Sequence, residues 1–291
     1  MKHINGKTQL VGIIGWPVGH SFSPAMHNAA FAAAGLNWAY APLPVKAEDV
    51  ATAVSALPAL GFRGVNVTVP HKQAVMPHLD ALDPGAQAIG AVNTLIFHNR
   101  KSEIVNPKSV GYNTDWSGFL ADLQALGVAV AQRDCLVLGA GGSARAVVYA
   151  LTQAGGRVCV LARRPLQAQQ LAADLQPHLP QAQVQAGDLA RLGEAATAVS
   201  APLIVNTTPL GMAPHAATSA WPADLPFPPG AFAYDLVYNP AVTRFMRQAQ
   251  AAGCRAANGL GMLLHQGAQA FKLWTGQEPD LAVMRAALNL N

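Results

Sequence analysis

Short runs of apolar, mostly β-branched residues alternate with Ala-rich and Leu-rich segments along the N-terminal part of the chain. Runs of this kind, bounded by Gly and Pro, are typical of buried strands, and the segments between them have the spacing of helices. We expect strands at 9–15, 38–45, 64–69, 91–97 and 110–112. Helices are expected from Ser23 to a stop at Gly35, and over 48–57 before Pro58. The polar stretch 98–109 is expected to be a hairpin or an exposed loop.

The pattern changes after residue 115. Apolar residues then recur at helical spacing until Gly127, which predicts a helix that links two domains. Beyond it, short apolar runs alternate with helical segments, and this alternation predicts a parallel, doubly wound sheet. The strands expected in that sheet are 135–138, 158–161, 183–185, 203–206 and 232–236.

The chain is therefore predicted to be an α/β protein of two domains, which agrees with its length of 291 residues. Residues 1–114 are expected to form an α/β domain, and residues 115–259 the doubly wound domain. A last helix over 260–274 carries an apolar stripe, and we expect it to pack back against the first domain, so that 260–291 completes that domain. Two domains create one cleft, where a small ligand is expected to bind.

Composition favours a globular protein, because 51% of the residues are hydrophobic and only 12% are charged. No apolar run approaches the roughly 20 residues of a membrane span, and no secretory signal is present, so we expect a cytoplasmic protein. The three cysteines lack the spacing of metal ligands, and neither a disulfide framework nor a metal site is expected. The 19 Lys and Arg residues are scattered, which argues against nucleic-acid binding and for a few arginines placed at phosphate or carboxylate groups of a ligand.

A glycine-rich turn follows the first strand of the second domain. The apolar strand runs into Gly139-Ala140-Gly141-Gly142-Ser143-Ala144 and then into an apolar helix. This is the strand, G-x-G-x-x-A, helix arrangement of Rossmann-type dinucleotide-binding domains, in which the first glycine permits the turn and the second admits the pyrophosphate. A glycine-rich turn without a ligand is the alternative, but the flanking strand and helix favour a dinucleotide site.

The end of the next strand indicates which dinucleotide binds. An NAD-dependent enzyme usually has Asp or Glu there, on the ribose 2′-hydroxyl, whereas this chain has Ala162-Arg163-Arg164. A guanidinium group can make charge-assisted, bidentate hydrogen bonds to a 2′-phosphate. The sequence therefore predicts NADP(H) as the cofactor. The alternative is two solvated arginines at a helix start, where positive charge opposes the helix dipole.

Four polar clusters lie at strand ends or turns of the first domain. They are 19–24, 66–72, 90–94 and 111–115. Taken singly, their side chains have ordinary explanations: Ser23 and Asp115 as helix caps, Thr68 and Asn93 as turn residues. Together they supply hydroxyls, amides, one lysine and one aspartate, a set that can bind a polyhydroxylated ring and move one proton.

These clusters resemble those of shikimate dehydrogenases, and the resemblance extends from near the N-terminus to the final helix. The matching motifs are Gly15-Trp16-Pro17-Val18-Gly19-His20-Ser21-Phe22-Ser23-Pro24, His27-Asn28, 66–72, 90–94, Asn113-Thr114-Asp115, the glycine loop, 206–212 and 258–266. The resemblance implies reversible, NADPH-dependent reduction of 3-dehydroshikimate to shikimate in the pathway to aromatic amino acids, with no metal. It also implies a small-molecule partner only, in a monomer or a homodimer.

By the same resemblance, Lys72 and Asp115 form the catalytic pair. The residues implied to contact shikimate are Ser21, Ser23, Thr68, Lys72, Asn93, Asp115, Tyr238 and Gln266. Those implied to contact NADP(H) are Gly139, Ala140, Gly141, Gly142, Ser143, Ala162, Arg163, Leu236 and Gly259, and the 2′-phosphate argument adds Arg164 to them.

Three features depart from the family pattern. The family often has Asn-Arg-Thr at 162–164, so Arg163 matches while its neighbours differ. His71 stands where an aromatic residue is common, beside the catalytic lysine. The stretch 98–109 is longer than usual.

Two other functions stay open from the sequence. A quinate/shikimate dehydrogenase that uses either cofactor is the enzymatic alternative, against which Thr68 and the arginine pair argue. A sensor that binds shikimate-like metabolites without catalysis is the other, against which the intact Lys72 and Asp115 argue. An interdomain salt bridge without chemistry is the corresponding alternative for these two residues.

Overall fold

The computed structural model describes residues 4–98 and 108–289. Most of the predicted loop 98–109 therefore lies outside the described residues. The chain divides into two compact units: unit 1 comprises Met1–Gly118 and Leu263–Asn291, and unit 2 comprises Phe119–Met262. The chain passes between the units within two helices, α4 (Asp115–Ala125) and α9 (Leu260–Thr275).

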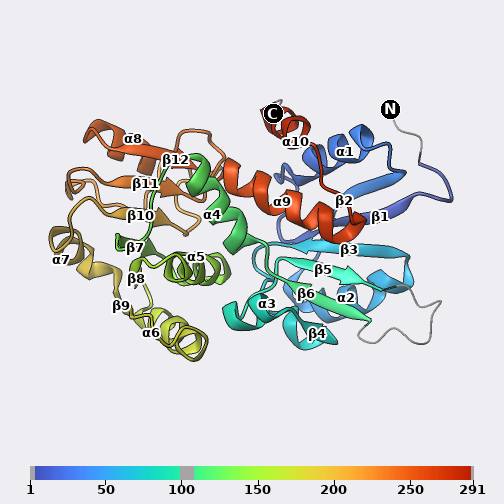
Figure 1. The fold of residues 1–291 in the computed structure, drawn as a ribbon, viewed down its shortest axis with the longest axis horizontal. Helices are drawn as coiled ribbons and strands as arrows, with labels where there is room; N and C mark the ends of the chain where they lie inside the picture. The colour runs from blue at the N-terminus through green and yellow to red at the C-terminus, as the bar shows by residue number, and fades with distance from the viewer. Residues whose placement is uncertain (1–3, 99–107, 290–291) are drawn as a thin grey trace. The chain divides into compact units, whose positions relative to one another are not determined.

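Unit 1 is built on a six-stranded mixed sheet of order β2-β1-β3-β5-β6-β4 (Figure 1). Its strands are β1 (Gln9–Gly15), β2 (Trp38–Pro44), β3 (Phe62–Val67), β4 (Ala81–Leu82), β5 (Thr94–Phe97) and β6 (Ser109–Tyr112). Strands β1, β2 and β3 are parallel, as expected for strands joined by helices, whereas β5 runs antiparallel to β3 and β6. The antiparallel β5–β6 pair confirms the predicted hairpin pairing around residues 98–109.

Alternation along β3 separates an apolar face of this sheet from a face with polar side chains. Val65 and Val67 pack in the cluster that contains Val54 and Leu57 of helix α2. Because successive side chains of a strand point to opposite faces, Asn66 points away from α2. The helices of unit 1, besides its parts of α4 and α9, are α1 (Ser23–Ala33), α2 (Val50–Ala59), α3 (Pro84–Ile89) and α10 (Leu281–Asn289), with 3-10 turns η1 (Ala47–Asp49) and η2 (Met76–His78).

Unit 2 is a six-stranded, fully parallel sheet of order β12-β11-β10-β7-β8-β9. Its strands are β7 (Asp134–Leu138), β8 (Arg157–Ala162), β9 (Val184–Asp188), β10 (Leu203–Asn206), β11 (Phe232–Asp235) and β12 (Arg255–Asn258). Its helices are α5 (Gly142–Gln153), α6 (Pro165–Leu175), α7 (Leu192–Thr197) and α8 (Arg244–Ala251), with η3 (Gln176–His178) and η4 (Leu189–Arg191). Counted from β7, the order is 6-5-4-1-2-3, the doubly wound Rossmann order, with the chain reversing direction across the sheet between β7 and β10.

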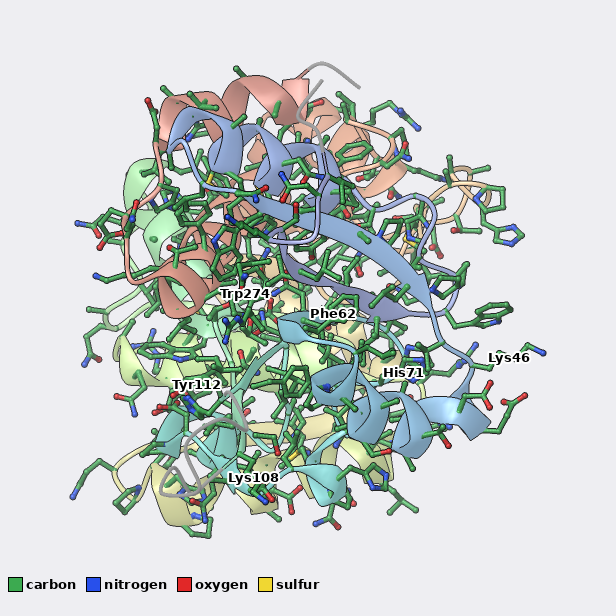
Figure 2. All side chains as sticks on the ribbon, turned by 90° about the vertical axis from the view of Figure 1, so that its right-hand side faces the viewer. Lys46, Phe62, His71, Lys108, Tyr112 and Trp274 are labelled. Carbon is green, nitrogen blue, oxygen red and sulfur yellow. The ribbon has the colours of Figure 1, made fainter. Side chains whose placement is uncertain are left out.

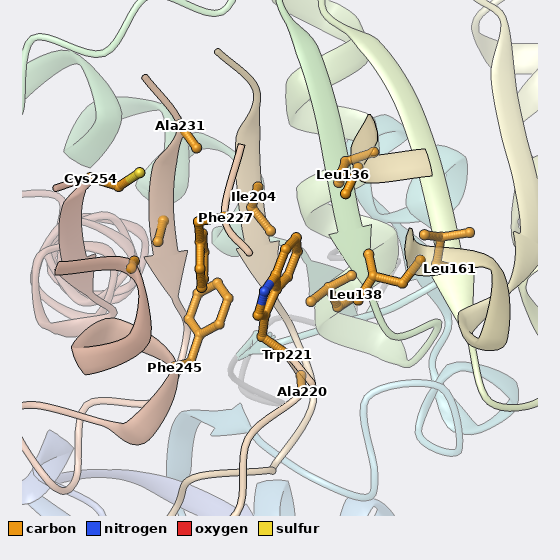
Figure 3. Packing of buried hydrophobic residues seen from close by; sticks show 14 residues of the cluster. Leu136, Leu138, Leu161, Ile204, Ala220, Trp221, Phe227, Ala231, Phe245 and Cys254 are labelled. Carbon is orange, nitrogen blue, oxygen red and sulfur yellow. The ribbon is translucent and has the colours of Figure 1, made fainter. Parts of the chain in front are cut away.

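Aromatic side chains fill one face of the unit 2 sheet (Figure 3). The rings of Trp221 and Phe227 stack with centroids 4.3 Å apart, and Phe245 of α8 packs against Phe227. Trp221 comes from an irregular segment, and its Nε1–H donates to the carbonyl of Leu225 at 2.7 Å, so that burial leaves no unpaired donor. Burial of these rings against Leu136 and Ile204 stabilises the two strands that flank the reversal point.

Most expected strands are confirmed, including those near residues 9–15, 135–138 and 203–206. The predicted end of the second helix is wrong, because α2 continues through Pro58, and the N–H groups of Leu60 and Gly61 close its last turn. The cap predicted as the alternative for Ser23 is also wrong, because Phe22 is the N-cap residue and Ser23 is already helical and buried. Helices α3 and α10 and strands β4 and β12 were not predicted from the sequence. Among the described residues, no helix is both long and apolar enough to cross a membrane.

Candidate active site

Lys72 and Asp115 form a nearly buried ion pair in unit 1. The Nζ atom of Lys72 lies 2.6 Å from Oδ2 of Asp115, and the two side chains are 11% and 7% exposed. Lys72 lies beyond the end of β3, where its carbonyl accepts from the Val92 N–H at 2.7 Å. Asp115 is the first residue of α4, and its N–H donates to Oδ1 of Asn113 at 3.0 Å. A protonated amine thus lies against a carboxylate in a position that little water reaches.

Asn93 holds the other oxygen of this carboxylate. Its Nδ2 donates to Oδ1 of Asp115 at 2.9 Å, to Oγ1 of Thr114 at 3.0 Å and to Oε1 of Gln266 at 3.3 Å. Gln266 lies on α9, and its own Nε2 donates to the carbonyl of Leu263. The structure therefore brings together four predicted site residues that come from widely separated parts of the chain.

Thr68 and the two predicted serines lie at other strand and helix ends of unit 1. The backbone N–H of Thr68 donates to the carbonyl of Ile14, and a Cβ at Gly15 would lie 2.3 Å from Cγ2 of Thr68. Only glycine therefore lets the ends of β1 and β3 approach so closely. Ser21 and Ser23 form a separate pair at the start of α1, where Oγ of Ser21 accepts from the N–H of Ser23 at 3.3 Å.

His71, the residue next to the lysine, is buried and has a structural hydrogen bond. Its Nε2 lies 2.7 Å from the carbonyl oxygen of Val45. Since a carbonyl only accepts, this nitrogen carries the proton and donates. The ring thereby ties the Lys72 segment to the chain after β2 (Figure 2).

The glycine loop of unit 2 fits a dinucleotide by its backbone. Gly139 has a φ of +111°, and a Cβ there would lie 2.6 Å from Oγ1 of Thr207, so a side chain is excluded on both grounds. Gly141 is the N-cap residue of α5, and no neighbouring atom lies within 4 Å of the position that a Cβ would take there. Thr207 follows β10, so the loop lies at the reversal point of the sheet, where dinucleotides bind in this fold. The open approach to the N-terminus of α5 suits a pyrophosphate.

The two predicted arginines stand where the sequence analysis expects them. Arg163 follows β8, and Arg164 is the N-cap residue of α6. Both side chains are exposed, and neither forms an ion pair within residues 4–98 and 108–289. Their charges are therefore available to an anionic group at the end of β8, which fits a ribose 2′-phosphate.

Leu236 and Gly259, two further predicted cofactor contacts, lie against each other in unit 2. A Cβ at Gly259 would lie 2.3 Å from the Leu236 carbonyl oxygen, so close packing requires glycine there. Tyr238 follows on the same segment, is half-buried, and burial raises the pKa of its hydroxyl. Its hydroxyl therefore stays protonated at neutral pH.

A buried carboxylate, which the sequence analysis missed, holds this segment in place. Oδ1 of Asp235 accepts from Nδ2 of Asn206 at 2.8 Å and from the N–H of Val237 at 3.0 Å. Oδ2 accepts from Oγ1 of Thr243 at 2.6 Å. Burial raises the pKa of Asp235 to about 6, against these hydrogen bonds, which lower it. Asp235 thus joins the end of β10 to the segment after β11. In the sequence, the signal that could have indicated this carboxylate was a strand that ends in Asp, with a polar motif on the neighbouring strand.

Comparisons with known proteins show which family the chain belongs to. Residues 13–95 match the model of a shikimate dehydrogenase substrate binding domain, and residues 259–288 that of a shikimate 5′-dehydrogenase C-terminal domain. The NADP(+)-dependent shikimate dehydrogenase of Moorella thermoacetica is 48% identical, over 99% of this chain and 95% of the relative. The chain belongs to the shikimate dehydrogenase family.

Solved structures of shikimate dehydrogenase family members have the same fold. The Thermus thermophilus enzyme, crystallised with NADP(H) and shikimate, is 40% identical with a TM-score of 0.82, over 97% of this chain and 99% of that one. A quinate dehydrogenase from Corynebacterium glutamicum, crystallised with NAD, is 33% identical with a TM-score of 0.86, over 98% and 99%. This chain is thus similar both to a shikimate dehydrogenase crystallised with NADP(H) and to a quinate dehydrogenase crystallised with NAD.

Proposed function

We propose that this protein catalyses the reversible reduction of 3-dehydroshikimate to shikimate with NADPH, in the pathway to aromatic amino acids. One observation carries the proposal beyond family membership: the 2.6 Å ion pair of Lys72 and Asp115, braced by Asn93. A protonated amine in that position can give one proton to a substrate oxygen.

In this proposal unit 1 binds the hydroxylated acid and unit 2 binds the dinucleotide. The residues of unit 1 proposed to contact substrate are Ser21, Ser23, Thr68, Lys72, Asn93, Asp115 and Gln266, and the predicted contact of Tyr238, which lies in unit 2, stays a prediction. Those proposed to hold NADP(H) are Gly139, Ala140, Gly141, Gly142, Ser143, Ala162, Arg163, Arg164, Leu236 and Gly259. Bound there, NADPH supplies a hydride to the C3 carbonyl carbon of the substrate.

Lys72 supplies the proton of the reduction. Negative charge develops on the carbonyl oxygen as its carbon is reduced, and the Lys72 ammonium stabilises that charge and donates a proton to the oxygen. Asp115 favours the charged amine and fixes its direction through Oδ2. The neutral amine left behind regains a proton from solvent. In the oxidation of shikimate the same step runs in reverse, and the neutral amine of Lys72 accepts the proton from the substrate hydroxyl.

Initial rates with two acids and two cofactors test the proposal. NADPH formation at 340 nm is measured with shikimate and with quinate, and NADH formation likewise. We expect the highest kcat/KM for shikimate with NADP⁺, because a site that does not bind the extra C1 hydroxyl of quinate leaves that group unpaired. Preference for quinate with NAD⁺ would instead assign the protein to quinate oxidation.

A third result would exclude catalysis. If no combination is turned over while fluorescence titration still shows shikimate binding, the protein is a ligand sensor. The intact Lys72–Asp115 pair supports an enzyme over this function. A cytoplasmic location and a monomeric or homodimeric state stay predictions.

A further inference from the structure

A buried tyrosine on β2 is linked to the ion pair by a continuous series of hydrogen bonds. The hydroxyl of Tyr40 donates to Oδ1 of Asn66 at 2.8 Å. The two residues lie on strands that flank β1, and they are 4% and 5% exposed. Tyr40 belongs to no motif that the sequence analysis singled out.

The side-chain amide of Asn66 has one possible orientation. Its Nδ2 lies 3.2 Å from the backbone carbonyl of Asn93, which can only accept, so the NH₂ group must face that carbonyl. Oδ1 then faces Tyr40, and the tyrosine hydroxyl must donate. The same Nδ2 also donates to Oγ1 of Thr94 at 3.1 Å, which leaves the Thr94 proton to donate onward.

The amide of Asn93 is fixed in the same way. Its Oδ1 accepts from the backbone N–H of Thr114 at 2.8 Å, and a backbone N–H can only donate. Oδ1 also accepts from Oγ1 of Thr94 at 3.1 Å. The NH₂ group of Asn93 must therefore face Oδ1 of Asp115, 2.9 Å away. Donors and acceptors thus follow one order from Tyr40 to the carboxylate that holds Lys72.

Aromatic neighbours fix the ring that begins this series. The ring of His27, on α1, stacks on Tyr40 with centroids 4.6 Å apart and planes 3° apart, and Trp274, on α9, packs 6.0 Å away. The indole of Trp274 is itself held by its hydrogen bond to the carbonyl of Leu95. The side chains packed around the Tyr40 ring therefore hold its hydroxyl toward Asn66.

We propose that Tyr40 is a positioning residue for proton transfer, which acts through Asn66, Thr94 and Asn93 to hold Asp115 against Lys72. This inference rests on the proposed function. Hydrogen bonds in a buried series polarise one another, so loss of the first donor weakens those that follow it. Without the hydroxyl, Oδ1 of Asn66 has no donor from Tyr40, and its amide loses the contact that holds it on that side.

A double-mutant cycle tests the proposal. Tyr40→Phe keeps the ring and its stacking on His27 but removes the hydroxyl. We expect kcat for 3-dehydroshikimate reduction to fall roughly three- to tenfold, the effect of about one hydrogen bond, with the KM for NADPH unchanged. In an Asp115→Asn background, Tyr40→Phe should change kcat less than about twofold, because residues that act as a unit are not additive. Equal losses in both backgrounds would overturn the proposal.

Two further sets of variants separate positioning from folding. Ser55→Ala removes a hydroxyl of unit 1, on α2, that is no member of the series, and kcat should stay within about twofold of wild type. Thr94→Val should reproduce the loss caused by Tyr40→Phe, while Thr94→Ser, which keeps the hydroxyl, should restore wild-type kcat. If Tyr40→Phe does not fold by thermal melt, the Thr94 pair decides, and equal kcat in Thr94→Val and Thr94→Ser overturns the proposal.

Wild-type turnover is measured first. Its absence would overturn the proposed function and this inference with it. Wild-type turnover with an additive cycle would overturn only the role of Tyr40.

Discussion

Forty-three positions separate Lys72 from Asp115, yet their charged atoms meet at 2.6 Å. Each is placed by its own backbone bond, Lys72 by Val92 and Asp115 by Asn113, so the pair does not depend on two flexible surface side chains. Burial makes such a pair costly unless its remaining lone pairs are satisfied, and Asn93 satisfies the second oxygen. Because burial of this pair costs free energy, a chemical role explains the pair better than a stabilising role.

Lys72→Met tests that role at the level of one atom group. The substitution keeps most of the side-chain length and removes the ammonium. We expect kcat for 3-dehydroshikimate reduction to fall on the order of 10²- to 10⁴-fold, the usual contribution of a positioned acid or base, with a smaller change in substrate binding. Steady-state kinetics are measured on protein shown to be folded by thermal melt and loaded by NADPH titration.

The matched control is Lys272→Met, which removes an exposed amine from α9 of the same unit. Its kcat should equal that of the wild type. Near-normal turnover of Lys72→Met would leave the lysine with a structural role alone.

Arg163 is the residue that we propose to determine the choice of cofactor. Arg163→Ala should weaken NADPH binding roughly tenfold or more and leave NADH binding nearly unchanged, because only NADPH has the 2′-phosphate. Dissociation constants from fluorescence titration of both cofactors check this. Arg164 lies next in the chain, so an Arg163→Ala, Arg164→Ala double variant shows whether Arg164 takes over the contact to the 2′-phosphate when Arg163 is lost. Equal weakening of NADPH binding and NADH binding would show that Arg163 does not contact the 2′-phosphate.

At the scale of elements, the sequence predicted those whose pattern is local. Strand β1 was predicted to the residue, because its apolar run is continuous and bounded. Strand β12 was missed because Arg255–Asn258 has no apolar run, and its pairing with β11 comes from the sheet. Helix α3 was missed despite local signals: Asp83 caps it, Pro84 begins it and Gly90 ends it with a φ of +67°.

The residues of the candidate site divide in the same way, into those that the sequence indicates and those that it does not. Lys72, Asp115, Asn93 and Gln266 were found by resemblance to a family, whereas no sequence pattern indicates that Tyr40 is linked to them. A tyrosine on a strand usually packs in the hydrophobic core. Only the three-dimensional register of β2, β1 and β3 brings the Tyr40 hydroxyl to Asn66.

Helix α9 provides a test of how an element places a site residue. Gln266→Ala removes the Oε1 that accepts from Asn93, so it should raise the KM for shikimate more than the KM for NADP⁺. Gln269→Ala is the matched control one turn later, where the side chain bonds Ser117 instead, and both KM values should stay close to those of the wild type. An effect of Gln266→Ala on NADP⁺ alone would place the residue at the cofactor.

Helix α1 buries a histidine whose titration is linked to folding. His27 is 0% exposed, and neither ring nitrogen has a hydrogen-bond partner among the described residues. Burial lowers the pKa of His27 from 6.5 to about 3. Between these values the unfolded chain binds a proton that the folded chain does not, so the free energy of unfolding falls as the pH falls below 6.5.

His27→Leu should remove this pH dependence. Between about pH 6 and pH 4, the slope of the unfolding free energy against pH should become shallower by about 1.4 kcal/mol per pH unit, the value for one proton. Urea denaturation at several pH values measures the slope. An unchanged slope in His27→Leu would show that its ring takes up a proton in the folded protein.

At the scale of the whole molecule, alternation of strands and helices was enough to predict the parallel sheet of unit 2. The order of its strands then follows from right-handed crossovers and one reversal point. The mixed sheet of unit 1 was less predictable, because β4 and β6 are short and their positions depend on contacts between distant segments. The lysine proposed as the proton donor thus lies in unit 1, and the glycine loop proposed to hold the dinucleotide lies in unit 2.

The most direct measurement is the identity and amount of product. Purified protein is incubated with 3-dehydroshikimate and a limiting amount of NADPH, and the products are quantified by chromatography and absorbance. We expect one shikimate formed for each NADPH consumed, with NADH giving far less product over the same time. NADPH that is not consumed, or consumed without formation of shikimate, would contradict the assignment of this site to shikimate dehydrogenation.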